Sequence, residues 1–191
     1  AGSVVVYAPA WKGAADFDAA QPFPVVRHPT SLMLPEPSVL RRAGELVRSE
    51  GCDSVLFGAA APLGLLASPL RRYGAERFVG ITHGHEAGWA ALPVARQVLR
   101  RIGDTVDVLT YLGEYTRSRM AKALSPAAAA RMARLAPGVD EKVFFPGAGG
   151  EEIRKRYGLT GRPVVVCVSR LVPRKGQDAL IHAWPRVMRA V

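Results

Sequence analysis

The sequence predicts an α/β protein built on a doubly wound parallel sheet. Short apolar runs such as VVVYA (4–8), DSVLFG (53–58) and RFVGITH (77–83) alternate with longer helix-like segments. Continuous apolar runs are typical of strands covered on both faces, and their alternation with helices is typical of parallel sheets. Hydrophobic content of 49% with 22% charged residues fits a globular chain that can bury a core.

The elements expected up to residue 145 follow one another in a regular order and form one domain, 1–145. Strands are expected at 4–8, 23–28, 53–58, 77–83, 106–112 and 133–137. Helices are expected from Pro37 to Glu50 with Ser38 as N-cap, over 62–74 closed by Gly74, over 89–103 interrupted near Pro93 and ended by Gly103, and over 114–124.

A change of composition after residue 136 predicts a linker and the start of a second domain. The stretch APGVDEKVFFPGAGG (136–150) is rich in Gly and Pro and has no periodicity. It is followed by a basic helix (EEIRKRYG), a strand at 163–168 and a helix at about 177–190. One βα unit cannot bury a core, because its strand needs neighbours. Residues 146–191 are therefore expected to be a linker and the truncated beginning of another α/β domain.

The charge and composition of the chain indicate which kinds of binding partner it suits. The net charge is +10, and from Pro146 onward nine Lys and Arg stand against three acids. Nucleic acid, an anionic membrane surface or a phosphorylated substrate would each suit such a balance. A nucleic-acid-binding module would interleave aromatics with cations, but aromatics are only 7% and lie mostly in apolar runs. We therefore expect no nucleic-acid partner.

Two further features bear on the compartment. Cys52 and Cys167 each lie in an apolar run without CxxC spacing, which predicts buried thiols in a reducing compartment. The longest apolar run, FGAAAPLGLLASPL, is broken by Pro62 and Pro69 and is shorter than the ~20 residues that cross a bilayer. A cytoplasmic protein without a spanning segment is expected.

The stretch VSRLVPRKGQD (168–178) has the layout of an anion site. Arg170, Arg174 and Lys175 crowd a turn between the expected strand and helix. Helix N-termini present free N–H groups to anions, Gly176 allows close approach of backbone, and arginine can form a hydrogen-bonded fork with phosphate. An ordinary basic loop is the alternative, since neither GxxxxGK[ST] nor GxGxxG occurs in the sequence.

The stretch ITHGHEAGW (81–89) follows an expected strand and offers His83, His85 and Glu86. A metal site is disfavoured, because the i, i+4 spacing of HExxH and a third ligand are missing. A structural loop histidine and an imidazole facing a substrate both remain open. Position at the carboxyl end of a strand, beside Gly84 and Gly88, favours the second interpretation. His28 and His182 are isolated and are expected to be surface or packing residues.

Together these motifs resemble a known family. SRLVPRKGQD before an amphipathic helix, with THGHE about ninety residues upstream and PGVD between, resembles the retaining glycosyltransferases of the GT-B fold, family four. The run FGAAAPLGLL…THGHEAGW…LPVARQVLRRIGDTVDVLTY is most similar to the actinobacterial GDP-mannose-dependent phosphatidylinositol mannosyltransferases. The resemblance implies two Rossmann-like domains and transfer of mannose from GDP-mannose to a phosphatidylinositol mannoside. A family-four enzyme with another nucleotide sugar or lipid acceptor is the alternative.

The resemblance also implies roles for individual residues. Arg170 and Lys175, with Gly176 beside them, match the donor-binding positions that hold the diphosphate, and His83 matches the catalytic strand-end histidine that faces the transferred sugar. Gly84, His85 and Glu86 are candidate substrate-facing neighbours. No metal or other cofactor is implied, and the partners are the nucleotide-sugar donor, an anionic lipid acceptor and the inner-membrane surface, to which the enzyme would attach peripherally.

The sequence departs from the family pattern at both ends. The glycine-rich loop that follows the family's first strand, and the acidic pair of its second domain, have no counterpart in these 191 residues. The chain is therefore expected to be an inactive piece of an active enzyme.

Overall fold

The computed structural model describes residues 3–190. The chain divides into two compact units, Ala1–Gly138 and Val139–Val191. The boundary expected from composition, between residues 145 and 146, lies a few residues beyond this division. The assignment of the two units as separate domains stays a prediction.

The strands of the first unit are all parallel. β1 (Val6–Pro9) pairs with β2 (Val25–His28), with Val6 opposite Val25. A second sheet has the order β3-β4-β5-β6 and contains Ser54–Phe57, Arg77–Gly80, Val108–Tyr111 and Ala133–Arg134. Six expected strands are thus present, although each is shorter than its apolar run, and the α/β class with parallel strands is confirmed.

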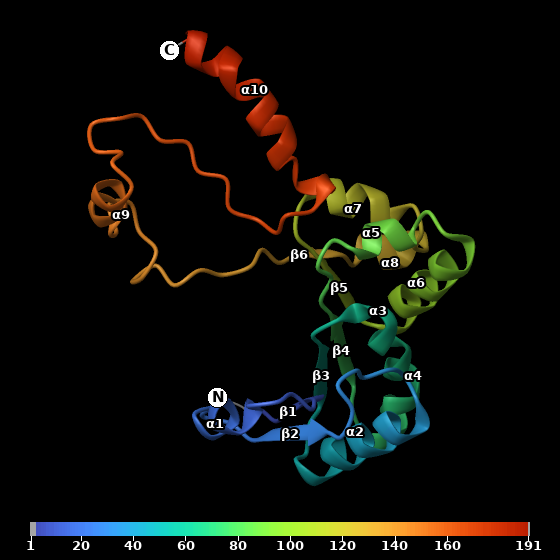
Figure 1. Ribbon diagram of the computed structural model, residues 1–191. Helices are drawn as coiled ribbons and strands as arrows, with labels where there is room; N and C mark the ends of the chain where they lie inside the picture. The colour runs from blue at the N-terminus through green and yellow to red at the C-terminus, as the bar shows by residue number, and fades with distance from the viewer. Residues whose placement is uncertain (1–2, 191) are drawn as a thin grey trace. The chain divides into compact units, whose positions relative to one another are not determined.

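Helices make the crossovers that parallel pairing requires (Figure 1). α2 (Pro37–Ser49) links β2 to β3, and the segment from β3 to β4 winds through four short helical pieces that end at Gly74. The other helices of this unit are α1 (Ala14–Ala19), α3 (Ala60–Leu63), η1 (Gly64–Leu66), α4 (Ala67–Leu70), η2 (Arg71–Tyr73), α5 (Glu86–Trp89), α6 (Pro93–Thr105), α7 (Glu114–Ala121) and α8 (Pro126–Ala130).

Two expected helix ends are wrong. The N-cap of α2 is Glu36, with Pro37 in the first turn, and Ser38 donates its hydroxyl proton to the Glu36 carboxylate at 2.8 Å. Proline at this position is favourable because its missing N–H would be unsatisfied anyway. Gly103 does not end α6 but lies within it. A Cβ atom at Gly103 would lie 2.6 Å from Leu124 Cδ2, so the glycine permits close packing.

The core of the first unit lies between the longer sheet and its helices. Phe57 on β3 and Phe78 on β4 stack with ring centroids 6.2 Å apart. The fully buried side chains around them come from several helices and include Leu70, Leu99, Ile102 and Met120. Removal of this apolar surface from water, at ~25 cal/mol per Å², is the main force that holds the sheet and helices together.

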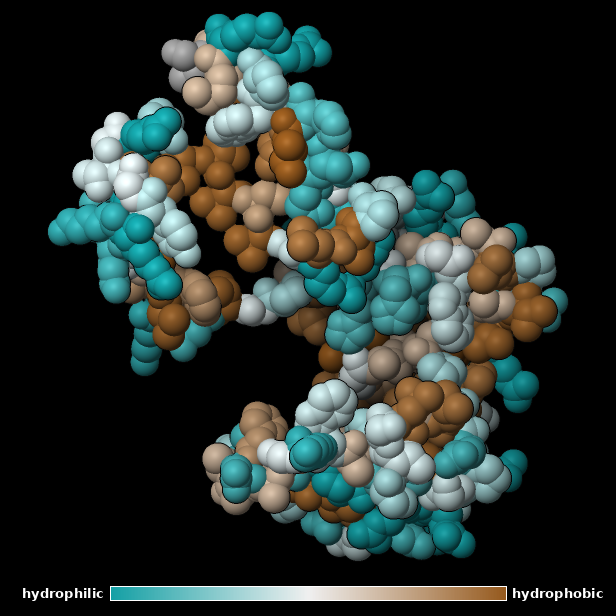
Figure 2. Space-filling view, in the orientation of Figure 1, coloured by the Kyte–Doolittle hydropathy of each residue, from teal (hydrophilic) through white to brown (hydrophobic). Residues whose placement is uncertain are grey.

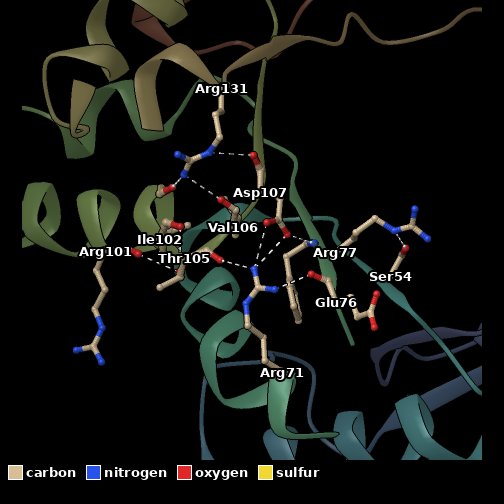
Figure 3. Close-up of polar contacts among 12 residues, drawn as sticks. Ser54, Arg71, Glu76, Arg77, Arg101, Ile102, Thr105, Val106, Asp107 and Arg131 are labelled. Atoms are coloured by element: carbon tan, nitrogen blue, oxygen red, sulfur yellow. Dashed lines mark hydrogen bonds and ion pairs between the residues drawn. The ribbon is translucent and has the colours of Figure 1, made fainter. Parts of the chain in front are cut away.

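A polar network joins the start of β4 to the segment between α6 and β5 (Figure 3). Asp107 accepts a hydrogen bond from the backbone N–H of Phe78 at 2.7 Å. Both of its carboxylate oxygens also lie 3.2 Å from Arg71 Nη2. Arg131 donates to the carbonyl oxygens of Gly103, Val106 and Asp107 at 3.1, 3.4 and 3.2 Å. The last carbonyls of a helix have no partner within the helix, and Arg131 supplies one.

The second unit contains α9 (Gly150–Arg156), η3 (Pro173–Lys175) and α10 (Gln177–Ala190). The strand expected at 163–168 is not formed, and Val165, Val166 and Val168 are 61, 73 and 89% exposed. A strand is stabilised by hydrogen bonds to neighbouring strands, and no strand occurs between residues 139 and 190 to supply them. Cys167, expected to be buried, is exposed for the same reason, while Cys52 is half-buried.

Two smaller expectations can be checked in the described residues. His28 is buried, and its Nδ1 atom forms a 2.6 Å hydrogen bond with the Tyr7 hydroxyl, as expected of a packing residue. His182 is exposed on α10, as expected of a surface residue. Within residues 3–190, no helix combines the length and the apolar character needed to span a bilayer.

Candidate functional site

The turn Thr82–Glu86 lies where β4 ends, between the carboxyl ends of β3 and β5. The Thr82 hydroxyl donates to the Thr110 carbonyl at 2.7 Å, and the Thr82 N–H donates to the Thr110 hydroxyl at 3.3 Å. On the other side, the N–H of Ile81 donates to the carbonyl of Phe57 at 2.9 Å. Ligands of open parallel sheets bind at this edge, so the turn lies where a substrate is expected.

His83 is exposed at this edge, but its ring is held in place. Its Nε2 atom lies 2.6 Å from the carbonyl oxygen of Gly58, at the end of β3. Because a carbonyl oxygen can only accept, Nε2 must carry the proton. In the neutral imidazole, Nδ1 is then the hydrogen-bond acceptor, so His83 can accept a hydrogen bond from a group such as a hydroxyl.

The residues after His83 shape the turn. Gly84 has φ +90°, a conformation that residues with a side chain rarely adopt. The His85 ring is exposed and stacks on the His83 ring, with centroids 6.3 Å apart. Glu86 is fully buried, so the expectation that it faces a substrate does not fit its position in this chain. Its carboxylate lies under the turn and accepts the His83 N–H at 3.0 Å.

The second candidate cluster lies in the other unit, on the turn before α10. Arg170 and Lys175 are exposed, and Gly176 has φ +71°. The turn is tied together by backbone bonds from Val172 N–H to the Arg170 carbonyl and from Lys175 N–H to the Val172 carbonyl, both at 2.9 Å. Within residues 3–190, neither cation forms an ion pair with a carboxylate, so both are available to an external anion.

Gln177 is a residue that the sequence analysis missed. Its side-chain amide donates to the Arg170 carbonyl at 2.9 Å and also contacts the Ser169 hydroxyl. It thereby connects the start of α10 to Arg170, whose side chain is one of the candidate phosphate-binding groups. The signal was available, because a polar residue directly after the glycine can reach back across a tight turn.

The predicted site residues thus form two groups, each of which the structure brings together. His83, Gly84, His85 and Glu86 make one turn in the first unit, and Arg170, Lys175 and Gly176 make another in the second. No group of three or more His, Cys, Asp or Glu side chains in the described residues could hold a metal ion.

Comparison with known proteins connects this α/β chain to glycosyltransferases that move mannose. The protein-family models that were searched give no match. The curated proteins, however, include close relatives, and all of those described below are GDP-mannose-dependent mannosyltransferases that act on a phosphatidylinositol mannoside by name.

The relatives share the donor and the class of acceptor that their names give. The GDP-mannose-dependent alpha-(1-6)-phosphatidylinositol monomannoside mannosyltransferase of Mycolicibacterium smegmatis is 55% identical over 98% of this chain. The enzyme of the same name from Mycobacterium tuberculosis is 54% identical over 99% of it. In Corynebacterium glutamicum, the GDP-mannose-dependent monoacylated alpha-(1-6)-phosphatidylinositol monomannoside mannosyltransferase is 44% identical over 98% of it. The chain spans about half the length of these relatives. The resemblance of the sequence motifs to GDP-mannose-dependent phosphatidylinositol mannosyltransferases is confirmed.

Proposed function

We propose that the whole protein transfers mannose from GDP-mannose to a phosphatidylinositol mannoside, with retention of configuration. The observation that supports this most strongly is the 55% identity across almost the whole chain, which includes both candidate clusters. Donor and acceptor are those in the relatives' names, and the stereochemical course is that of the family the motifs resemble. In this proposal GDP-mannose is a substrate, and the chemistry uses no metal or other cofactor.

Arg170 and Lys175 are the donor-binding residues of this proposal, with Gly176 beside them. Negative charge accumulates on the diphosphate as the bond to mannose breaks. Fixed cations near that charge stabilise the transition state more than the ground state, and this difference accelerates the reaction. The free N–H groups at the start of α10 add partial positive charge next to the same two side chains.

His83 is the catalytic residue of the proposal and faces the transferred sugar. Its Nε2 proton is directed to the Gly58 carbonyl, which leaves Nδ1 to accept a hydrogen bond from a sugar hydroxyl. Such a bond would orient the mannose for transfer without adding a charge at the reacting carbon. Gly84 contributes to this geometry through its backbone, because its φ of +90° is one that residues with a side chain rarely adopt.

The donor assignment is tested by three single alanine variants of the whole protein. Arg170→Ala and Lys175→Ala should each lower kcat by about 10²-fold or more, as expected for lost electrostatic stabilisation. Arg174→Ala, on the same turn, is the matched control and should change little beyond the salt dependence. Turnover and GDP-mannose binding are measured for all three. Near-wild-type rates for Arg170→Ala and Lys175→Ala would refute the assignment, and a preference for another nucleotide sugar would favour the alternative family member.

We further propose that the protein attaches peripherally to an anionic membrane surface, where its lipid acceptor lies. Leu92 and Val94, at the start of α6, are 60 and 76% exposed. Arg96 and Arg100 follow on the same helix and line one hollow together with Pro93. Figure 2 shows hydrophobic surface around the start of this helix, beside hydrophilic surface. Apolar side chains next to cations suit the boundary between lipid tails and anionic headgroups.

Flotation of the whole protein with liposomes tests this attachment. Binding should increase with the fraction of anionic lipid, and Arg96→Ala/Arg100→Ala should weaken it by roughly thirtyfold, since each of the two cations near the surface contributes ~1 kcal/mol. Arg41→Ala/Arg42→Ala, a pair on α2, is the control. Flotation that is unchanged at high salt would contradict electrostatic attachment, because salt screens exposed charges.

A further inference from the structure

The Glu86 carboxylate occupies an unusual place under the His83 turn. Its side chain is 0% exposed. Oε2 accepts the backbone N–H of His83 at 3.0 Å. Oε1 is buried and has no hydrogen-bond partner in the described residues, and His85 Nε2 lies 3.5 Å from it. A buried carboxylate with only one good hydrogen bond is costly, so its presence at this position calls for an explanation.

The backbone of the turn explains how the carboxylate reaches His83. Gly84 adopts φ +90° and reverses the chain, so that the residue three positions after His83 returns to the His83 N–H. A side-chain acceptor at this place does for the turn what an N-cap does for a helix, because it satisfies an N–H that has no backbone partner. Without the carboxylate, this flexible glycine turn would lose its tie to the backbone of His83.

His83 is therefore held at two of its atoms. Glu86 fixes the backbone nitrogen, and the Gly58 carbonyl fixes ring atom Nε2 at 2.6 Å. Two fixed points on one residue determine where the remaining ring atom, Nδ1, is directed. The second contact depends on the first, since a displaced backbone would carry the ring away from Gly58.

We propose that Glu86 is a positioning residue that acts through His83 and does not contact the substrate. Its task is to hold the histidine backbone so that Nδ1 is presented at the carboxyl edge of the sheet. The inference rests on the role proposed above for His83. It replaces the expected substrate-facing role of Glu86 with a hydrogen bond beneath the turn. Misplacement of a reacting group by ~1 Å can lower a rate by about 10²-fold, so a remote tie of this kind can be catalytically important.

Five variants of the whole protein, among them His83→Ala, test the proposal by kinetics. Glu86→Ala removes the acceptor and should lower kcat by about tenfold or more, with GDP binding within about twofold of wild type. Glu86→Gln keeps an acceptor oxygen and should retain kcat within about threefold. His83→Ala/Glu86→Ala should be no slower than His83→Ala alone, because residues that act as one unit are not additive. Glu45→Ala, on an exposed part of α2, is the control for loss of a glutamate.

Amide hydrogen exchange at His83 provides a measurement that does not depend on activity. The His83 N–H should exchange at least about tenfold faster in Glu86→Ala than in wild type, whereas Glu86→Gln should protect it. This result would stand even if the wild-type protein transferred no mannose, so failure of the proposed function is separable from failure of the positioning role. If Glu86→Ala does not fold, Glu86→Met, which fills a similar volume without an acceptor oxygen, takes its place in the single variant, in the double variant with His83→Ala and in the exchange measurement.

Three outcomes would overturn the proposal. Additive losses in His83→Ala/Glu86→Ala would show that Glu86 acts independently of His83. A rate for Glu86→Gln as low as that of Glu86→Ala would show that the negative charge matters and not the hydrogen bond. Unchanged exchange of the His83 amide in Glu86→Ala would show that the carboxylate does not hold the turn.

Discussion

At the scale of single residues, a paired contact joins α1 to β2. Arg27 donates from Nε and Nη2 to the two carboxylate oxygens of Asp18, at 2.9 and 2.5 Å. The hydrogen bonds from Arg27 lower the pKa of Asp18 below its usual value of 3.8, and the positive charge acts in the same direction. A group with a depressed pKa in the folded protein stabilises the fold above its unfolded pKa, and that contribution is lost as the pH falls through the folded value.

Asp18→Asn should therefore lower the unfolding midpoint of the whole protein by a small amount at pH 7, because the pair is partly open to solvent. The difference from wild type should shrink as the pH is lowered through and below 3.8, where Asp18 itself becomes protonated. Thermal unfolding at several pH values measures both effects. Asp16→Asn, on the same helix, is the control. A difference that grows toward low pH would contradict the assignment.

Residues differ in how far the sequence alone could place them. His83 and Gly84 could be identified, because the end of an apolar run followed by glycine predicts a loop at the edge of a parallel sheet. The burial of Glu86 could not be predicted, since glutamate is almost always exposed and only the left-handed turn at Gly84 brings its carboxylate underneath. For Arg170 and Lys175, the sequence correctly predicts a basic turn before a helix. Their donor-binding role stays a prediction.

At the scale of elements, the alternation of strands and helices was predictable, whereas the ends of elements were not. Gly103 illustrates the difference, because its place inside α6 depends on the approach of Leu124 from a distant segment. α8 was missed within an alanine-rich stretch, although its signal was present. Ser125 accepts the N–H of Ala128 at 3.2 Å, and Pro126 begins the helix. Serine followed by proline is a recognised helix start.

The polar network around Asp107 gives a prediction at this scale (Figure 3). Asp107→Ala leaves the N–H of the buried Phe78 without its acceptor and should lower the free energy of unfolding by ~1–3 kcal/mol. Asp107→Asn keeps an acceptor oxygen and loses only the charge opposite Arg71. Because that ion pair is partly exposed, its loss should be less than ~1 kcal/mol.

Urea unfolding of the whole protein and of both Asp107 variants measures these differences. Equal losses for the alanine and asparagine variants would show that the ion pair with Arg71, and not the hydrogen bond to the backbone of β4, stabilises this end of the sheet.

At the scale of the whole molecule, the two units differ in how much of their apolar surface is buried. The first unit forms sheets with a common core, as its regular alternation of strands and helices predicts. The apolar run 163–168 has strand character in its sequence but no neighbouring strand in its own unit. The relatives are about twice as long as this chain, so they contain sequence that could supply such strands. Local sequence pattern predicts which residues favour a strand, and partners elsewhere decide whether the strand forms.

We therefore expect residues 163–168 to become a buried strand when the rest of the protein is present, with Cys167 as the reporter. In the 191-residue chain Cys167 is exposed and should react readily with a maleimide, whereas in the whole protein its labelling should be at least about tenfold slower, since modification would require local opening. Cys52 lies in the first unit and is half-buried, so its labelling rate should be similar in both proteins and serves as the internal control. Mass spectrometry of the two cysteine peptides over time gives both rates. Equal rates for Cys167 in the two proteins would refute the buried strand, and with it the interpretation of residues 163–190 as the opening βα unit of a second domain.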